Sequence, residues 1–345
     1  MAAKVRVGIV GAGEVGGLGK SYNSHAGGYT RIEECELVAI AEIDEERLSQ
    51  FGDEWNIAAE HRYSTAAEMY EKANLDLVSV TTHTLHHHQP VIEAAEAGIK
   101  VIMVEKPLAK SVELGRKMVE ACDKAGSRLI TEHTRRFLPP FKKIKKMIDD
   151  GMIGEVRTIE TSGFRPLLEN GTHTVNYAFY WTDATPKLVA GYLSDEPGAD
   201  PGGGGMVICE GGVVFFINCV APSGEGDAAT LIAGTKGRIQ YNEYRGVWEY
   251  GPLAEVSDND ETASYQWEDI PDMPTVVNRD DYYYGAALES VQCFLEDRES
   301  IGSGRDGLRT LEVITAIHIS HKTGSMVPLP LAGGLDQLEI RSTGE

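Results

Sequence analysis

Residues 5–16 read VRVGIVGAGEVG, an apolar strand pattern that runs directly into three glycines at the spacing Gly-x-Gly-x-x-Gly. The first glycine permits a tight turn, the second lets the backbone approach a pyrophosphate, and the third lets a helix pack closely against the strand. Because the motif stands between a predicted strand and a predicted helix, it indicates a dinucleotide site rather than a chance cluster. We expect this turn to bind the cofactor through Gly11, Gly13, Glu14, Val15 and Gly16.

Acidic residues follow the second predicted strand, where this type of fold carries the ribose ligand. Glu42 comes 26 residues after Gly16, against about 20 in the usual motif, and we attribute the excess to an insertion over 17–24. Asp44 is assigned to the cap of the next helix, which leaves Glu42 to bind the ribose hydroxyls. A carboxylate there repels a 2′-phosphate, so the sequence favours NAD over NADP, although Arg47 leaves some NADP binding open.

Short apolar runs alternate with amphipathic stretches through the first part of the chain. This order is typical of a parallel sheet with crossover helices, and the apolar runs lie at 5–10, 37–41, 75–81, 101–104 and 128–131. We therefore predict an α/β architecture that begins with a Rossmann domain, a doubly wound parallel sheet that binds NAD, over residues 1–133.

From about Gly154 the strand patterns are separated by turns rather than by helices. The patterns lie at 156–162, 207–209, 213–220, 230–233, 238–241 and 246–250. Helices are predicted at 175–181, 285–296 and 308–322. We predict a second α/β domain over residues 134–345, with a large open, mainly antiparallel sheet that binds substrate and joins copies of the chain.

The composition is that of an acidic globular protein. The formal net charge is −21 at pH 7, which disfavours nucleic acid and anionic membranes as partners. The N-terminus leads into the first strand without the apolar stretch of a secretory signal, so we expect a cytoplasmic protein. The five cysteines form no Cys-x-x-Cys pair and indicate reduced, buried thiols rather than disulfides or a zinc site.

Glu105-Lys106-Pro107 directly follows the fourth strand pattern. Together with the glycine turn, it resembles the glucose–fructose oxidoreductase/inositol dehydrogenase (Gfo/Idh/MocA) family. Residues 82–87, THTLHH, are similar to the family's Thr-Pro-Asn-x-x-His loop, and Gly171-Thr172-His173 looks like its Gly-x-His. The resemblance spans nearly the whole chain. It implies NAD-dependent hydride transfer between nicotinamide and a secondary alcohol of a sugar, polyol or sugar derivative, in a homodimer or homotetramer.

Hydride transfer from a secondary alcohol requires a base for the hydroxyl proton and a donor that stabilises charge on the oxygen. Lys106 follows the carboxyl end of a strand, where doubly wound folds bind ligands, and the resemblance implies that it hydrogen-bonds the reacting oxygen and takes part in the proton relay. His173 is the predicted acid/base, because an imidazole titrates near neutral pH; a structural histidine is the alternative. Glu169 stands where the family carries the aspartate partner of this histidine.

Further residues are expected to contact the cofactor or the substrate. Contacts with NAD are expected from Thr82, His83, His87, Glu105 and Lys106. The guanidinium of Arg165 suits a carboxylate or several hydroxyls, and the ring of Tyr177 suits a sugar face, with an ion pair and a core position as the respective alternatives. Asn176 replaces an aspartate of the family pattern and keeps hydrogen bonding without charge. With Lys106 and His173, these three form the predicted substrate set.

Histidines 83, 86, 87 and 88 raise the question of a metal site. Zinc requires further ligands, and no Cys or Asp/Glu spacing supplies them, so we predict no metal. Two other functions stay open. One is a glycosidase that retains NAD and acts through a transient keto intermediate, and the other is a non-catalytic NAD-sensing regulator.

Overall fold

The computed structural model describes residues 3–194, 200–221, 228–242, 245–253, 265–274 and 280–340. Its contacts divide the chain into two compact units, Met1–Leu138 with Val276–Arg309 and Pro139–Thr275 with Thr310–Glu345. The sequence predicts one boundary, after residue 133, whereas the first unit also includes a later segment. That segment contains helix α8 (Asp280–Leu295), whose Ser290 Oγ lies 3.2 Å from the Tyr29 hydroxyl.

The first unit is built around a parallel sheet. Its described strands run in the order β3-β2-β1-β4-β5-β6, and every neighbouring pair is parallel. The order reverses between β1 and β4, and in such sheets ligands bind at the carboxyl ends of the strands beside that reversal. The predicted Rossmann fold is confirmed. Its strands are β1 (Val5–Val10), β2 (Cys35–Ala41), β3 (Arg62–Tyr63), β4 (Leu77–Val80), β5 (Val101–Glu105) and β6 (Arg128–Glu132).

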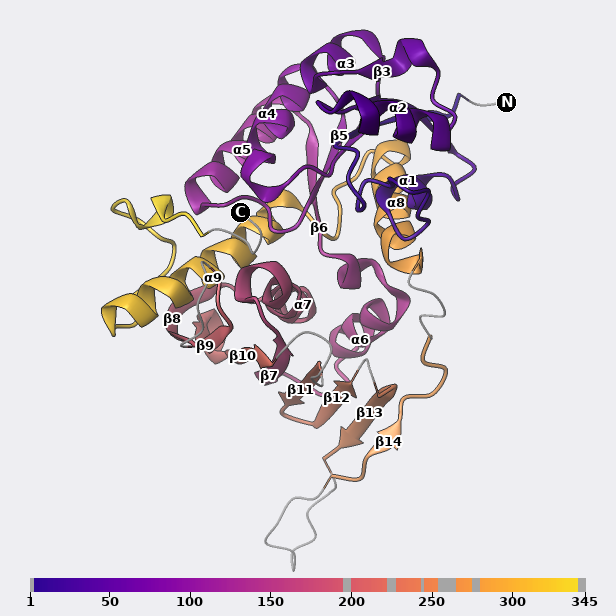
Figure 1. Cartoon of the computed structure of the whole chain (residues 1–345). Helices are drawn as coiled ribbons and strands as arrows, with labels where there is room; N and C mark the ends of the chain where they lie inside the picture. The colour runs from indigo at the N-terminus through magenta and orange to yellow at the C-terminus, as the bar shows by residue number, and fades with distance from the viewer. Residues whose placement is uncertain are drawn as a thin grey trace, which may run out of the picture. The chain divides into compact units, whose positions relative to one another are not determined.

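Helices cover this sheet, with α3, α4 and α5 on one side and α1 and α8 on the other (Figure 1). Local signals set their ends. Asp44 accepts hydrogen bonds from the backbone of Glu46 and Arg47, as predicted for the cap of α2. Gly126, at φ 70°, ends α5 in the left-handed conformation. The helices are α1 (His25–Tyr29), α2 (Glu45–Glu54), α3 (Ala66–Lys72), α4 (His88–Glu96) and α5 (Val112–Ala125).

The second unit contains one large mixed sheet. Its described strands run in the order β14-β13-β12-β11-β7-β10-β9-β8-β15; β7 and β10 pair in parallel and the other pairs are antiparallel. This agrees with the predicted mainly antiparallel sheet. The strands are β7 (Val156–Phe164), β8 (Pro186–Leu193), β9 (Gly203–Cys209), β10 (Val214–Ala221), β11 (Ala229–Gly234), β12 (Gly237–Asn242), β13 (Val247–Pro252), β14 (Glu268–Asp269) and β15 (Val327–Pro328).

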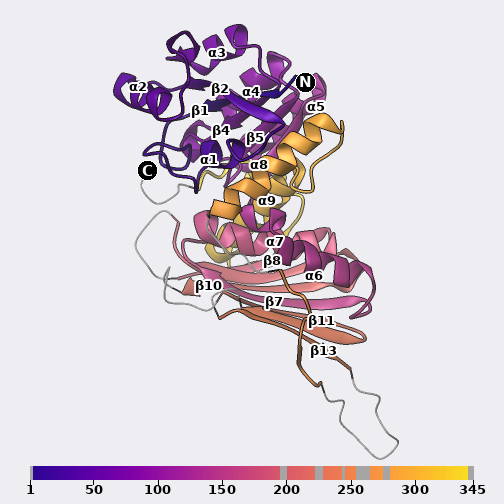
Figure 2. The same cartoon turned by 90° about the vertical axis from the view of Figure 1, so that its right-hand side faces the viewer.

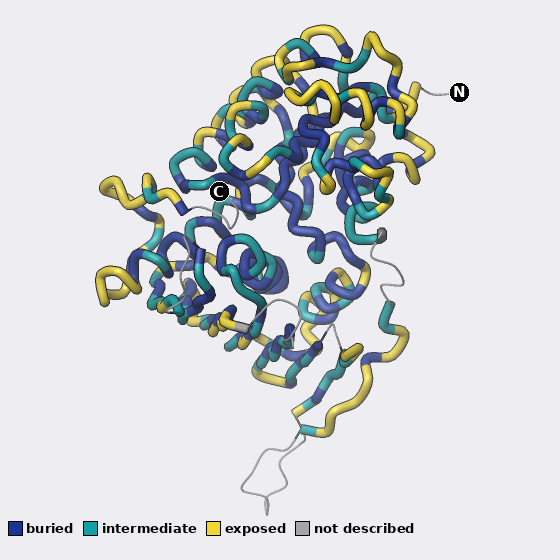
Figure 3. The backbone as a smooth tube through the Cα atoms, viewed as in Figure 1, coloured by how far each residue is buried: buried dark blue, intermediate teal, exposed yellow. Residues whose placement is uncertain are grey.

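Helices α6 (Pro139–Asp149) and α7 (Thr172–Thr182) lie on the same side of this sheet (Figure 2). Almost all of α7 is buried (Figure 3). Phe141 and Trp181 stack with their ring centroids 5.6 Å apart, and the Trp181 Nε1 donates a hydrogen bond to the Phe141 carbonyl at 3.1 Å. Aromatic side chains therefore form much of this core.

Helix α9 (Gly304–Thr323) begins in the first unit's segment and continues in the second unit. Over the part of the chain that the structure describes, no helix has the length and apolar character that crossing a membrane requires.

Candidate active site

The glycine turn lies at the carboxyl end of β1, beside the reversal in strand order. Gly11 has a φ of 98°, and its N–H donates to the Ala41 carbonyl at 2.8 Å, which ties the turn to the end of β2. A Cβ on Gly16 would collide with the Gly11 carbonyl oxygen, whereas nothing lies within 4 Å of a Cβ built on Gly13. Gly16 is therefore required by close packing, and Gly13 leaves open backbone that a pyrophosphate can approach.

The helix after this turn begins late. α1 starts at His25 with Ser24 as its N-cap, and the Ser24 hydroxyl accepts a hydrogen bond from the Gly27 N–H at 3.1 Å. The late start agrees with the predicted insertion over 17–24. The Gly17 and Leu18 N–H groups both donate hydrogen bonds to the Gly13 carbonyl, at 3.0 and 3.1 Å. These bonds close one helical turn within the glycine segment, before α1 begins.

Glu42 directly follows β2 and lies against the glycine turn. Its Oε2 accepts a hydrogen bond from the Ala12 N–H at 2.6 Å, and its Oε1 accepts one from the Asp44 N–H at 3.0 Å. The Thr82 hydroxyl, just after β4, is buried and has no hydrogen-bond partner among the described residues. An open Gly13, an adjacent carboxylate and an unpaired hydroxyl just beyond the neighbouring strand β4 fit a bound dinucleotide.

His87 holds two loops together. Its Nε2 lies 2.9 Å from the Thr82 carbonyl oxygen and its Nδ1 lies 3.0 Å from that of Pro107. Burial lowers the pKa of His87, and a neutral imidazole donates through only one of these nitrogens. Because protein atoms occupy both nitrogens, His87 braces these two loops, and its predicted contact with the cofactor stays a prediction. His83 is exposed, and its contact with NAD stays a prediction.

Glu105 is the last residue of β5, and Lys106 follows it. The Glu105 Oε1 lies 3.1 Å from the His25 Nε2, and its Oε2 accepts a hydrogen bond from the Lys106 N–H at 2.9 Å. Burial raises the pKa of Glu105, but the hydrogen bond and charge of His25 together with the charge of Lys106 leave the pKa lowered. The Glu105 carboxylate thus fixes the backbone that carries Lys106, and its predicted contact with the cofactor stays a prediction.

In the second unit, Glu169 and His173 stand on consecutive helical turns. The π-helical turn η4 (Leu167–Gly171) runs directly into α7, and Gly171 has helical dihedrals of −61° and −22°. Gly171 therefore does not interrupt the helix. The sequence alone leaves it open whether a helix continues through this glycine. Both side chains are half-buried, so the backbone is compatible with the predicted pairing of Glu169 with His173.

The other predicted substrate residues differ in their surroundings. Arg165 is half-buried. Asn176 is buried, and its Nδ2 donates to the Thr310 hydroxyl at 3.1 Å. Tyr177 is buried in the aromatic core, where its hydroxyl lies 3.1 Å from the Thr230 hydroxyl on β11. Tyr177 thus occupies the core position that the sequence leaves open, and its contact with substrate stays a prediction.

Two family models together match most of the chain. Residues 5–133 match the oxidoreductase family's NAD-binding Rossmann fold, and residues 145–329 match its C-terminal alpha/beta domain. The chain belongs to the Gfo/Idh/MocA oxidoreductase family. This confirms the resemblance based on the glycine turn and on residues 105–107, and it identifies NAD as the cofactor of the Rossmann domain.

Several known proteins are similar to this chain. The D-apiose dehydrogenase of Paraburkholderia graminis is 27% identical over 350 residues, covering 91% of this chain and 88% of that protein. The myo-inositol 2-dehydrogenase of Thermotoga maritima is 31% identical over 162 residues, covering 47% and 46%. A solved levoglucosan dehydrogenase, in complex with NADH and levoglucosan, has a TM-score of 0.79 at 20% identity, covering 95% of this chain and all of that one. This last likeness shows the shared fold.

This Gfo/Idh/MocA chain also carries a buried carboxylate that sequence reasoning missed. Asp200 is 3% exposed; its Oδ1 accepts a hydrogen bond from the Leu168 N–H at 2.9 Å and its Oδ2 accepts one from the Glu169 N–H at 3.1 Å. It thereby caps the start of η4, which leads to His173. The donors lie 32 and 31 residues away in sequence, so no local pattern indicates this contact.

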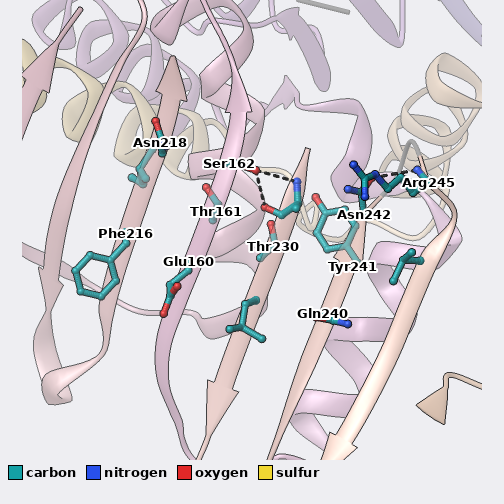
Figure 4. Close-up of a pocket in the computed structure, with 14 residues that line it drawn as sticks. Glu160, Thr161, Ser162, Phe216, Asn218, Thr230, Gln240, Tyr241, Asn242 and Arg245 are labelled. Carbon is teal, nitrogen blue, oxygen red and sulfur yellow. Dashed lines mark hydrogen bonds between the residues drawn. The ribbon is translucent and has the colours of Figure 1, made fainter. Parts of the chain in front are cut away.

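A hollow of about 550 Å³ lies on the second sheet, and no predicted site residue lines it. Figure 4 shows the side chains that line it on neighbouring strands, among them Phe216, Glu160 and Gln240. These three residues follow one another across the sheet in register through β10, β7, β11 and β12. The hollow is therefore a feature of the sheet face and carries none of the predicted catalytic groups.

Proposed function

We propose that this chain is an NAD-dependent dehydrogenase that transfers a hydride between nicotinamide and a secondary alcohol of a sugar, polyol or sugar derivative. One observation carries the proposal: Lys106 follows the carboxyl end of β5, its N–H is held by the buried Glu105, and the same sheet ends in a glycine turn open at Gly13. The names of the D-apiose and myo-inositol dehydrogenases support the class of substrate.

Each proposed catalytic residue has a distinct role. NAD, when bound, supplies the hydride acceptor or donor. The Lys106 ammonium donates a hydrogen bond to the reacting oxygen and stabilises the negative charge that develops there as the proton leaves. The His173 imidazole accepts the proton during oxidation and returns it during reduction. Glu169 orients that imidazole, and Arg165 and Asn176 hold other oxygens of the substrate.

The proposed preference for NAD rests on Glu42. Its carboxylate already accepts hydrogen bonds from the Ala12 and Asp44 backbone beside the glycine turn. A ribose offers hydroxyl donors to such a carboxylate, whereas a 2′-phosphate brings a second negative charge against it.

The first experiment follows NADH absorbance while the protein is supplied with NAD and a panel of sugars, polyols and sugar acids. Turnover of at least one compound, with much weaker turnover when NADP replaces NAD, is the expected result. Bound NAD without net NADH formation on any alcohol would contradict the proposal. Glycoside hydrolysis would then indicate the NAD-retaining glycosidase, and the absence of both reactions would indicate the NAD-sensing regulator.

We also infer that the outer face of the second sheet joins two copies of the chain in a homodimer. Phe216, in the hollow of Figure 4, is 43% exposed, and Tyr192, 44% exposed on β8, reaches Asn218 of β10 with its hydroxyl at 3.1 Å, so more than one large apolar side chain is exposed on this sheet. Light scattering is expected to give the mass of a dimer or of a dimer of dimers, and Phe216→Glu is expected to lower it. A monomeric wild-type protein would exclude this assembly.

A further inference from the structure

Three titratable side chains meet behind the Lys106 loop, within the first unit. Glu105 and Glu132 end the neighbouring parallel strands β5 and β6 and are paired in register, so their side chains leave the sheet on the same face. His25, the first residue of α1, contributes its imidazole to the same point. One ligand atom from each of the three lies within 4.8 Å of the others, and all three residues are buried.

The hydrogen bonds around this cluster leave one carboxylate oxygen without a partner. The His25 Nδ1 lies 2.7 Å from the Ser79 hydroxyl, and its Nε2 lies 3.1 Å from Glu105. The second Glu105 oxygen accepts the Lys106 N–H. In the described part of the chain, the Glu132 Oε1 has no hydrogen-bond partner although the residue is 1% exposed. Both Glu105 oxygens thus have hydrogen-bond partners, whereas the Glu132 Oε1 has none among the described residues.

Part of the cover of the cluster comes from Tyr283 on α8. The Tyr283 ring, on α8, lies 5.2 Å from the His25 ring, centroid to centroid, and Tyr283 also faces Glu105 and Glu132. The charged and titratable groups that face the carboxyl pair belong to four parts of the first unit. They are His25 and Tyr29 on α1, His87 before α4, Lys106 after β5 and Tyr283 on α8.

Two carboxylates this close in a buried place do not both ionise, because each negative charge lacks solvent and repels the other. We propose that Glu132 keeps its proton while Glu105 is ionised, so that the pair carries one negative charge, and that this charge state holds the Lys106 backbone in place. Burial, followed by the charge of Glu105, raises the pKa of Glu132 well above its usual range. Glu132 is a positioning residue that acts on Lys106 through Glu105.

This arrangement gives the pair a defined response to pH. While Glu132 is neutral, the pair carries only the charge of Glu105, next to His25 and Lys106. When Glu132 ionises, a second negative charge appears beside Glu105, and repulsion between the carboxylates disturbs the group that accepts the Lys106 N–H. The effect of Glu132 on turnover rests on the proposed dehydrogenase activity, whereas its protonation does not depend on any activity.

The protonation is tested by infrared spectroscopy of the full-length protein across a pH series. We expect the carbonyl stretch of a protonated carboxylic acid at neutral pH in the wild type and its loss in Glu132→Gln. The matched control is Glu289→Gln, because Glu289 is also buried in the first unit but is bound by the Arg298 guanidinium at 2.9 and 3.2 Å, which favours its ionised form. The control is expected to keep the band.

A measurement without any substitution protects the test against a variant that fails to fold. Protein labelled with carbon-13 at the glutamate carboxyl carbons is expected to show one glutamate that remains protonated at neutral pH. A neutral-pH spectrum with every glutamate ionised would overturn the proposal. So would one equivalent of a divalent metal in the purified protein that is lost in Glu132→Gln, since the three ligand atoms would then hold a cation instead of a proton.

The positioning role is tested with the pH profile of kcat/KM. Glu132→Gln mimics the protonated acid, so we expect turnover within about threefold of wild type at neutral pH and a weaker decline on the alkaline side. Identical profiles for wild type and variant would exclude the role in positioning Lys106. If no sugar or polyol is oxidised at all but the infrared band is present, the proposed function fails and the protonated Glu132 stands.

Discussion

Two buried carboxylates, one in each unit, hold the backbone of a segment that carries a proposed catalytic residue. In the first unit, Glu105 accepts the N–H of Lys106, its immediate neighbour in sequence. In the second, Asp200 accepts the N–H groups of Leu168 and Glu169, at the start of the helical segment that leads to His173. The first contact is made within one residue, and the second requires the chain to return after about 30 residues.

This difference shows that the same physical task has a local and a long-range solution. A carboxylate that accepts the N–H of the next residue is positioned by the end of its own strand. Glu105 and Lys106 therefore form a motif that can be recognised in the sequence. A carboxylate that caps a helical turn needs two free N–H groups and a chain segment that passes nearby. Asp200 meets that condition only in the folded second unit.

Removal of the Lys106 side chain, whose backbone N–H is bound by Glu105, is expected to give the largest loss of activity. Lys106→Ala should lower kcat by about 10²- to 10⁴-fold, because the reacting oxygen loses its charged donor, while the Kd for NAD changes little. Steady-state kinetics and NAD titration measure the two quantities. Lys100→Ala is the control, since Lys100 is exposed at the other end of β5 and should keep activity. Equal losses in both variants would remove Lys106 from the proposed chemistry.

Removal of the Asp200 carboxylate is expected to give the second-largest loss of activity. Asp200→Ala leaves the buried Leu168 N–H and the half-buried Glu169 N–H without this acceptor, and we expect about 2–4 kcal/mol lower stability, given ~1–3 kcal/mol for each unsatisfied group. We also expect kcat/KM to fall at least tenfold with unchanged NAD affinity, because η4 no longer presents Glu169 and His173 correctly. Urea unfolding and kinetics below the unfolding midpoint separate these effects. Asp149→Ala, on the exposed end of α6, is the control, and full activity in folded Asp200→Ala would limit Asp200 to a structural role.

The pH dependence of stability should distinguish the first unit's carboxyl pair from Asp200. The pKa of Glu132 is raised by burial and by Glu105, so its contribution is present below the pKa of an unfolded glutamate and is lost as pH rises toward the raised value. Glu132→Gln does not titrate, so its stability relative to wild type should increase with pH, by at most about 1.4 kcal/mol per unit. Urea unfolding at pH 5 and pH 8 measures this difference, and a constant difference would contradict it.

A third carboxylate, that of Glu42, extends the comparison, and its substitution is expected to have the smallest effect. Glu42 directly follows β2, whereas Glu105 is the last residue of β5. Glu42 also accepts backbone N–H groups nearby, but it is proposed to bind the ribose as well. Glu42→Gln keeps the size of the side chain and removes the charge that repels a 2′-phosphate, so we expect the preference for NAD over NADP to fall about tenfold. Competitive NAD and NADP titrations provide the measurement, and an unchanged ratio would place the ribose ligand elsewhere.

The sequence by itself determined what depends on neighbours along the chain. The strand-turn-glycine pattern at residues 5–16 decides the Rossmann turn, because backbone approach and helix packing need glycine at fixed offsets. Helix α2 begins where Asp44 caps it, and the late start of α1 follows from the interval between Gly16 and Glu42. Strand β3, with two residues, carries no periodic signal and was not predictable in this way.

The tertiary structure decided what depends on residues that meet from distant segments. The folded second unit places the Tyr177 side chain in the aromatic core, because the face of α7 that carries it packs against β11. The tertiary structure placed both nitrogens of His87 between two loops, brought α8 onto the first unit, and set Asp200 under η4. It also brought His25 and Glu132 to Glu105. Burial and mutual repulsion exist only after these groups meet, so the charge state of the pair is a property of the fold and not of any motif.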